Sequence, residues 1–253
     1  MIFMLAGTSD ARNLALALQS AGYAVTATVV TDSAATSLAQ VGLPHLVGRL
    51  TAEEMAALIT ERGDRLVVDA SHPFAEEASK NAMAAAKSAG VPYIRYERAN
   101  EHYEHPLITV VKDYEEAAQL AATKRGVIML TTGSKTLATF TKVLQGLEHT
   151  RVIARMLPRL DNMEKCEALG VAQRDIVAIQ GPFSKELNEA LFRQYDVTLM
   201  ITKESGKVGS VDGKLEAALA CGIETILIAR PNIQYGQQYS SFEDVLQAVQ
   251  NIL

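Results

Sequence analysis

Short apolar runs without polar alternation recur along the chain and are separated by segments with helical periodicity. Such runs are typical of strands in a parallel sheet, because crossover helices bury both faces of it. The predicted strands are residues 2–6, 24–30, 45–47, 66–69, 93–96, 127–131, 151–154, 176–179, 197–202 and 225–229. The predicted helices are residues 9–21, 36–40, 52–62, 75–89, 135–145, 162–169, 185–195 and 213–220. The pattern predicts an α/β fold.

The second half of this pattern repeats the first at an offset that drifts from 125 to 133 residues. Residues 4–9 correspond in outline to 129–134, and 51–69 correspond to 184–202. Each half also has a trailing helix, at residues 114–122 and 242–252. Because residues 98–106 have no periodicity, we place a boundary there. We predict two Rossmann-like lobes with parallel sheets, an N-terminal lobe of residues 1–106 and a C-terminal lobe of residues 107–253, with a ligand cleft between them.

Composition narrows the class of function. The chain has 24 basic and 29 acidic residues, and this net charge of −5 argues against general nucleic-acid binding. The apolar start, residues 1–6, reads as a buried strand rather than a signal peptide, and no apolar run is long enough to cross a membrane. Cys166 and Cys221 are isolated, which favours a reducing cytoplasm and indicates small buried side chains. No spacing of His, Cys, Asp or Glu predicts a metal site.

Ligands of open parallel sheets bind beyond the carboxyl ends of the strands, so the loops after each predicted strand are candidate sites. Gly7, Thr8 and Ser9 follow the first strand and suit either a phosphate cradle or a plain tight turn, with Ser9 capping the helix. Only one glycine of the three-glycine dinucleotide fingerprint is present. Asp32 lies where an acid would bind a ribose diol, and it equally suits a helix cap.

Two further loops carry groups that suit acid–base chemistry or anions. His72 follows a buried strand and precedes Pro73, so its ring is expected at the edge of the sheet, either as a proton donor or in a structural hydrogen bond. Thr202, Lys203, Ser205 and Gly206 combine hydroxyl, ammonium and glycine directly after a strand, which suits an anionic group better than a solvated turn.

Basic residues gather at predicted strand ends although the chain is net acidic. A solvated surface explains any one of them, but seven at one edge favour a polyanionic ligand. These residues are Arg49, Arg98, Lys135, Arg155, Arg159, Lys203 and Arg230.

The chain resembles the precorrin-6A reductase family, the CobK/CbiJ enzymes of cobalamin biosynthesis, at several blocks in the right order. The blocks are residues 5–12, 47–50, 69–75, 92–95, 130–135, 180–184 and 202–206, spread over nearly the whole length. The resemblance implies hydride transfer from NADPH or NADH to a double bond of precorrin-6A or its cobalt complex. The family associates NADPH with the aerobic branch and NADH with the cobalt branch.

The resemblance also implies a tetrapyrrole substrate with many carboxylates, and it allows handover to neighbouring pathway enzymes. We expect the dinucleotide to contact Gly7, Thr8, Ser9, Asp32, Thr202, Lys203, Ser205 and Gly206. We expect the substrate to contact Arg49, Ser71, His72, Arg98, Ser134, Lys135, Arg155, Arg159 and Gln180. His72 and Lys203 are the candidate catalytic residues, as donors or relays of the accompanying proton.

Two other functions fit the same pattern. A glycosyltransferase that uses a nucleotide sugar also has two α/β lobes, and it would bind nucleoside diphosphates without NAD(P)H. A two-lobed protein that closes on an anion without chemistry is the other alternative.

Overall fold

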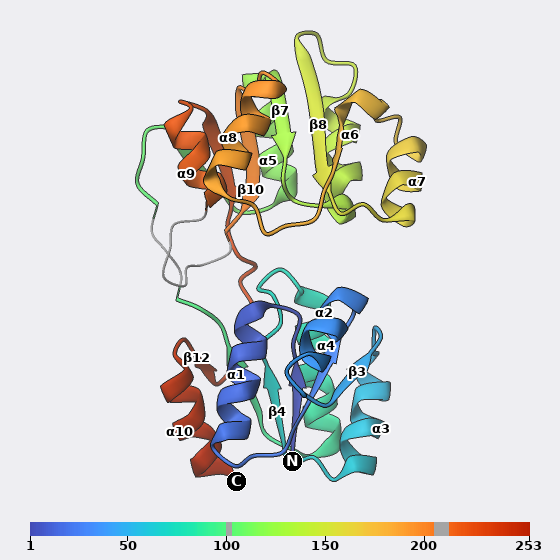
Figure 1. Ribbon diagram of the computed structural model, residues 1–253, viewed down its shortest axis with the longest axis vertical. Helices are drawn as coiled ribbons and strands as arrows, with labels where there is room; N and C mark the ends of the chain where they lie inside the picture. The colour runs from blue at the N-terminus through green and yellow to red at the C-terminus, as the bar shows by residue number, and fades with distance from the viewer. Residues whose placement is uncertain (100–102, 205–212) are drawn as a thin grey trace. The chain divides into compact units, whose positions relative to one another are not determined.

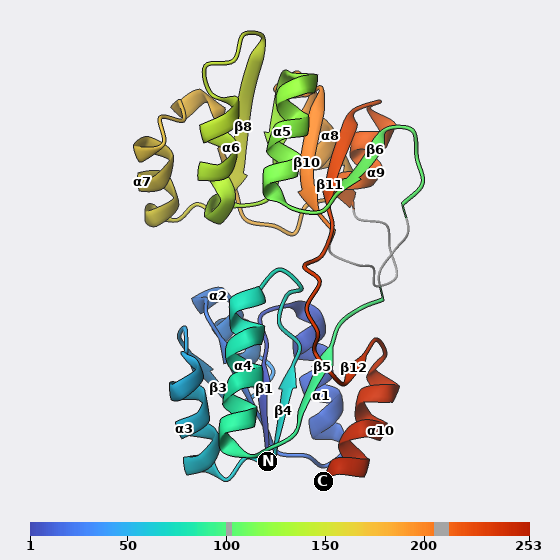
Figure 2. The same cartoon turned by 180° about the vertical axis from the view of Figure 1, so that it is seen from behind.

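The structure is a computed structural model that describes residues 1–99, 103–204 and 213–253. Within these residues the chain forms two compact units, each built on a six-stranded parallel sheet (Figures 1 and 2). The strands are β1 (Ile2–Leu5), β2 (Val25–Val29), β3 (His45–Val47), β4 (Leu66–Asp69), β5 (Tyr93–Tyr96), β6 (Ile108–Val111), β7 (Gly126–Leu130), β8 (Thr150–Met156), β9 (Ile176–Ala178), β10 (Leu199–Lys203), β11 (Glu224–Ile228) and β12 (Gln238–Tyr239).

Helices connect these strands, as a parallel sheet requires. They are α1 (Ser9–Ser20), α2 (Asp32–Ala39), α3 (Ala52–Arg62), α4 (Glu76–Ala89), α5 (Tyr114–Lys124), α6 (Leu137–Leu144), α7 (Leu160–Ala168), α8 (Lys185–Gln194), α9 (Gly213–Ala220) and α10 (Phe242–Ile252). Short 3-10 helices lie at Ser134–Thr136 and Gln173–Asp175. All ten predicted strands are confirmed, with bounds that differ from the prediction by at most two residues. None of the helices in the described ranges has the length and hydropathy that crossing a membrane requires.

Unit 1 comprises Met1–Ala99 and Pro231–Leu253, and its strand order is β12-β5-β4-β1-β2-β3. Its central strand is buried on both faces because its side chains alternate between two cores. Ile2 and Met4 pack in a core with α1, α2 and α10, whereas Phe3 and Leu5 pack in another with α3 and α4. Two-sided burial explains why the strands read as continuous apolar runs.

Unit 2 comprises Asn100–Arg230, and its strand order is β6-β11-β10-β7-β8-β9. Helices α8 and α9 cover one face of this sheet and α5 and α6 cover the other (Figures 1 and 2). The order of unit 2 reproduces that of unit 1 strand for strand, with β7 in the place of β1 and β10 in the place of β4. The predicted fold of two Rossmann-like lobes related by a repeat is therefore confirmed.

The two units exchange their last strand and helix. The first repeat ends with β6 and α5, which join the sheet of unit 2, where β6 pairs with β11. The second repeat ends with β12 and α10, which join unit 1, where β12 pairs with β5 and α10 packs beside α1 (Figure 1). The predicted division at residue 106 differs from this arrangement, since residues 231–253 belong with unit 1. The trailing helices were visible in the sequence, but the sheet that each one covers depends on a long-range strand pairing.

We predict that the core of unit 1 depends on α10. Val245 is fully buried, so Val245→Ala should lower the free energy of unfolding by about 1–3 kcal/mol. Hydrogen exchange should accelerate in unit 1 and stay unchanged in unit 2, measured together with urea unfolding. Gln250→Ala, at an exposed position of the same helix, is the control and should change neither. Faster hydrogen exchange in unit 2, with no change in unit 1, would contradict the assignment of α10 to unit 1.

Candidate functional site

The carboxyl edge of unit 1 has the geometry at which open parallel sheets bind ligands. Strands β1 and β4 are neighbours at the centre of the sheet, and the helices that follow them cover opposite faces. The loops after the two strands therefore diverge, which is the arrangement at which open parallel sheets form a ligand crevice. Residues 6–8 form the first loop and residues 70–75 form the second.

The turn after β1 keeps backbone close to this crevice. Gly7 has φ +152°, a conformation that favours glycine, and a Cβ built there would meet nothing within 4 Å. Thr8 caps α1 by accepting a hydrogen bond from the Ala11 N–H at 3.1 Å. The cap is thus Thr8 and not Ser9, which is the first residue of the helix. A ligand at this turn would meet open space above Gly7 and the N-terminus of α1.

Asp32 begins α2, directly beyond the end of β2. Thr31, not Asp32, caps this helix, because the Thr31 hydroxyl accepts from the Ala34 N–H at 3.3 Å. The capping alternative for Asp32 is therefore wrong. Its carboxylate lies at the end of the strand beside β1, the place where dinucleotide-binding sheets hold the acid that contacts a ribose.

The loop after β4 places His72 beside the crevice. The ring Nδ1 accepts the Phe74 N–H at 3.2 Å, and the two rings lie 5.9 Å apart. Because Nδ1 is an acceptor, the neutral ring carries its proton on Nε2. Partial exposure leaves His72 able to meet a ligand.

A buried charged triad, Asp69, Arg95 and Glu97, lies directly beneath this loop. Arg95 donates to Asp69 Oδ1 at 2.9 Å and to Glu97 Oε2 at 2.7 Å, and its side chain is fully buried. Burial by itself lowers the pKa of Arg95, but Asp69 and Glu97 outweigh it, so the pKa is raised and the charge is kept. The sequence analysis missed this triad. Its signal in the sequence was a charge within each of the strands β4 and β5 and a third charge directly after β5.

Ser71 and Tyr93 complete the arrangement around the triad. Ser71 donates both its N–H and its hydroxyl to Asp69 Oδ1, at 3.0 and 2.7 Å. The Tyr93 hydroxyl donates to Asp69 Oδ2 at 2.8 Å, and burial followed by the charge of Asp69 raises the pKa of Tyr93. Ser71, predicted to bind substrate, thus has internal partners for its side chain.

The two predicted arginines of unit 1 differ in their surroundings. Arg49 is exposed and follows β3 after Gly48. Arg98 forms an ion pair with Asp10, a buried residue of α1. Of the two, Arg49 is the more accessible cation at this edge.

The corresponding edge of unit 2 lies between β7 and β10. Gly133 has φ +85° and leads into the 3-10 helix. The Ser134 hydroxyl donates to Asn162 of α7, and Lys135 is exposed. The Thr132 and Thr136 hydroxyls lie 3.1 Å apart. Hydroxyls and an exposed ammonium therefore share this loop.

Three lysines gather at the end of β10. Lys214 of α9 donates to the buried Thr202 hydroxyl at 3.3 Å. Burial, and then the positive charges of Lys214 and Lys135, lower the pKa of Lys203 to about 8. A lysine with this pKa can give up a proton near neutral pH. Ser205 and Gly206, predicted to contact the dinucleotide, lie outside the described residues.

The other residues predicted in unit 2 lie at the end of β8 or follow β8 and β9. Arg155 is buried, donates to Asn188 Oδ1 at 2.7 Å and lies 4.6 Å above the Phe183 ring. Arg159 pairs with Asp161 at 2.9 Å, and Gln180 is exposed. Arg155 is thus a structural contact of α8 as well as a candidate ligand contact.

These contacts weaken the argument from seven basic residues. Arg98, Arg159 and Arg230 each pair with a carboxylate of their own unit, and Arg155 is bonded to an amide. A count of cations at strand ends therefore overstates the charge presented to a polyanion.

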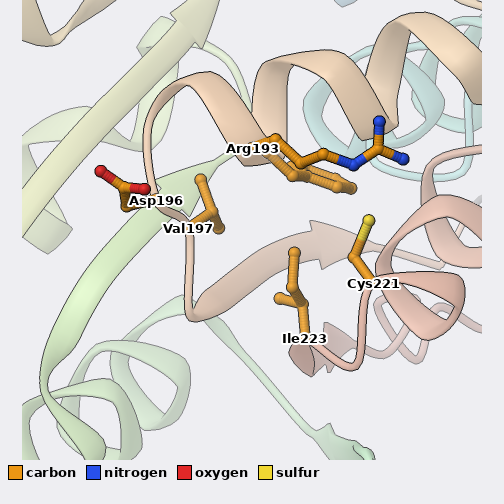
Figure 3. A pocket seen from close by; sticks show the side chains of 6 residues that line it. Arg193, Asp196, Val197, Cys221 and Ile223 are labelled. Carbon is orange, nitrogen blue, oxygen red and sulfur yellow. The ribbon is translucent and has the colours of Figure 1, made fainter.

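A cavity of about 390 Å³ lies at the opposite edge of unit 2, away from these loops (Figure 3). It is lined by Phe192, Arg193, Asp196, Val197, Cys221 and Ile223, where α8 and α9 end and β10 and β11 begin. Parallel sheets place their ligands at the other edge, so we do not assign the active site to this cavity.

Comparisons with known proteins decide the family. The family model described as precorrin-6x reductase CbiJ/CobK matches residues 1–250. The chain belongs to this family. It is 59% identical to the cobalt-precorrin-6A reductase of Priestia megaterium, over 99% of this chain and 98% of that protein. It is 36% identical to the cobalt-precorrin-6A reductase of Salmonella typhimurium, over 91% and 87% of the two chains.

A solved structure supports the fold of this CbiJ/CobK family member. The structure titled CobK precorrin-6A reductase aligns with a TM-score of 0.79 and 24% identity, over 99% of this chain and 96% of that one. Membership of the family makes the chain an oxidoreductase of cobalamin biosynthesis that acts on a carbon–carbon double bond.

We predict that Lys203 of this reductase titrates with a midpoint near pH 8. Lys214→Met removes a neighbouring positive charge and should raise the midpoint, although burial keeps it below the ordinary lysine value. The measurement is a ¹³C NMR titration of labelled lysine, with Lys203→Arg to assign the signal. Lys87→Met, in unit 1, is the control and should leave the midpoint unchanged. A midpoint at the ordinary value in the unaltered chain would contradict the prediction.

Proposed function

We propose that this chain reduces one double bond of cobalt-precorrin-6A with NADH or NADPH as the hydride donor, giving the 6B form. The observation that carries the proposal is the 59% identity, over 98% of its length, to a relative named cobalt-precorrin-6A reductase. The second relative reported above has the same name. Both names favour the cobalt-containing substrate over metal-free precorrin-6A.

The carboxyl edge of unit 1 fits a dinucleotide. Its strand order is that of dinucleotide-binding sheets, and the open turn at Gly7 lets a phosphate approach the backbone. Thr8 and Ser9 would contact the phosphates and Asp32 the ribose. Thr202, Lys203, Ser205 and Gly206 of unit 2 are the second proposed set of contacts with the cofactor. The bound dinucleotide would supply the hydride.

The substrate carries many carboxylates, and we propose that cations and hydrogen-bond donors of both units bind them. The proposed contacts are Arg49, Ser71, His72, Arg98, Ser134, Lys135, Arg155, Arg159 and Gln180. Reduction of a carbon–carbon double bond needs a proton as well as a hydride. The Lys203 ammonium is the proposed donor because its pKa is lowered to about 8, and the His72 Nε2–H is proposed to hydrogen-bond the substrate and relay that proton, taking one up at its ring as it passes one on.

We propose that the reaction takes place in the cytoplasm. Cys166 and Cys221 are both free thiols, as a reducing cytoplasm would keep them. We further propose that the reduced product passes to the next enzyme of the same pathway.

An anaerobic assay tests the reaction. Purified protein mixed with cobalt-precorrin-6A and either reduced dinucleotide should oxidise the dinucleotide in proportion to the substrate reduced. Thermal unfolding with each dinucleotide and with UDP separates the alternatives, because ligand binding to the folded state raises the midpoint. Protection by UDP with no dinucleotide oxidation would favour the glycosyltransferase. Protection by anions with no turnover would favour the non-catalytic protein.

We predict that Asp32 selects between the two dinucleotides. Loss of its bond to the ribose should weaken NADH about tenfold in Asp32→Ala, whereas NADPH should bind no worse because a repulsion with the 2′-phosphate is removed. Calorimetric titration of each dinucleotide gives the two dissociation constants. Glu61→Ala, an exposed acid at the far end of α3, is the control. An equal change for both dinucleotides would contradict a ribose contact.

We predict that Arg49 contributes to substrate binding without contributing to stability. Arg49→Ala should raise KM for the tetrapyrrole about tenfold, as expected for one lost charge-assisted hydrogen bond, and leave the unfolding midpoint unchanged. Arg65→Ala removes an exposed arginine before β4, at the other edge of the same sheet, and should leave KM unchanged. Equal KM values for the two variants would show that Arg49 does not contribute to substrate binding.

A further inference from the structure

The charged triad of unit 1 lies at the carboxyl ends of β4 and β5. Leu5, the last residue of β1, pairs in register with Asp69, and Asp69 pairs with Arg95. Glu97 lies two residues beyond Arg95, on the same side of the chain. All three charged residues are buried, with exposed fractions of 0%, 0% and 8%.

The second repeat provides an internal comparison for these three positions. Thr202 of β10 stands in the place of Asp69, since residues 184–202 correspond to 51–69, and it pairs with Leu227. Leu227 stands in the place of Arg95, and Ala229 lies two residues further on, in the place of Glu97. Thr202 and Leu227 are nearly as deeply buried as Asp69 and Arg95, with exposed fractions of 1% and 2%. The same positions are thus filled by uncharged side chains in one unit and by charges in the other.

This difference indicates that the fold alone does not require the charges. Exchanging a buried ion network for apolar side chains of similar volume is often neutral or stabilising, because desolvation of the charges offsets their attraction. Unit 2 forms its sheet with threonine, leucine and alanine at these places. The triad therefore calls for an explanation other than stability of the sheet.

The triad forms hydrogen bonds with the loop after β4. Asp69 Oδ1 accepts the Ser71 N–H and hydroxyl, and Arg95 also donates to the Ser71 hydroxyl at 3.2 Å. Three hydrogen bonds therefore hold Ser71, whose chain neighbour is His72. Tyr235, which lies before β12 in the part of unit 1 formed by residues 231–253, packs against the triad. Its ring lies 4.9 Å from the Arg95 guanidinium carbon.

The strand exchange reinforces this arrangement. Arg95 N donates to Gln237 O at 2.9 Å and Glu97 N donates to Tyr239 O at 3.0 Å. The backbone of two members of the triad is thereby held by β12, which comes from the end of the chain. The Arg95 side chain is thus held by Asp69 and Glu97, whereas its backbone is held by Gln237, from a distant part of the sequence.

We propose that Asp69, Arg95 and Glu97 are positioning residues that hold the loop of residues 71–74, and so orient the His72 ring towards the ligand. This inference rests on the role proposed for His72 in the reaction. The triad acts through hydrogen bonds to Ser71 and contacts no reacting atom itself.

The central experiment removes the three charges from unit 1, since unit 2 has uncharged side chains at the corresponding positions. The triple variant Asp69→Leu/Arg95→Met/Glu97→Leu should fold with an unfolding midpoint equal to or above that of the unaltered chain. Its kcat should fall about 100-fold, the size expected for a misplaced catalytic group. The single variant Arg95→Met leaves two buried carboxylates without their cation, so it should lose stability as well as activity.

A double-mutant cycle separates positioning from a general structural effect. If the triad acts through His72, adding His72→Ala to the triple variant should lower kcat no further, whereas independent effects would multiply. Multiplying effects, or an unchanged kcat in a folded triple variant, would overturn the proposal.

A measurement without substrate keeps the proposal testable if the proposed reaction fails. The ¹⁵N NMR signals of His72, assigned with His72→Gln, should show the Nε2–H tautomer in the unaltered chain and shift towards an average of both tautomers in the triple variant. Unchanged signals would overturn the positioning role. Absence of turnover in the unaltered chain would instead reject the proposed function alone.

The matched control is another arginine–aspartate pair of unit 1. Arg62 pairs with the buried Asp64 at 3.0 Å, after α3 and before β4, at the opposite edge of the sheet. Arg62→Met should lower the unfolding midpoint yet leave kcat and the His72 signals unchanged. Loss of kcat in this variant equal to that in the triple variant would mean that the effect is one of stability, and would overturn the proposal.

Discussion

Parallel pairing of strands that are buried on both faces is the constraint on which the rest of this structure depends. A strand needs a crossover before the next strand of the same parallel sheet, so all carboxyl ends of a sheet, and all loops that follow them, collect at one edge. The central strands β1 and β7 lie where successive crossovers turn to opposite faces. Loops from distant parts of the sequence, such as those after Leu5 and Asp69, are thereby brought to one crevice.

The exchange of trailing segments ties each unit to the whole chain. The edge of sheet 1 is closed by β12, the last strand in the sequence, and the edge of sheet 2 by β6, which follows the first five strands. Unit 1 therefore cannot form its complete sheet until residues 231–253 are present. The same strand pairs with β5 beside Arg95. The pairing that completes the sheet therefore also fixes the backbone of the triad.

The repeat also shows how a duplicated scaffold distributes its chemistry. Uncharged residues, Thr202, Leu227 and Ala229, occupy the positions in unit 2 where unit 1 has the charged triad, and the lysines at the end of β10 have no counterpart in the loop of His72. Equivalent backbone positions thus carry different chemistry in the two units. A similar fold with different loop chemistry is what an enzyme needs if its two units bind different parts of its ligands.

The apolar runs determined the ten strands, their parallel character and the repeat, because burial on two faces leaves a signal in every strand. Gly7, Asp32, His72 and Lys203 could be named as candidates, since each directly follows such a run. The sequence did not reveal β6 and β12, because a short edge strand is specified by its partner and not by its own residues. Nor could it reveal the partners of Arg98, Arg155 and Ser71, or that Thr8 and Thr31 cap their helices. Those contacts join residues far apart in the chain or depend on local backbone geometry, and only the tertiary structure decides which side chains remain for a ligand.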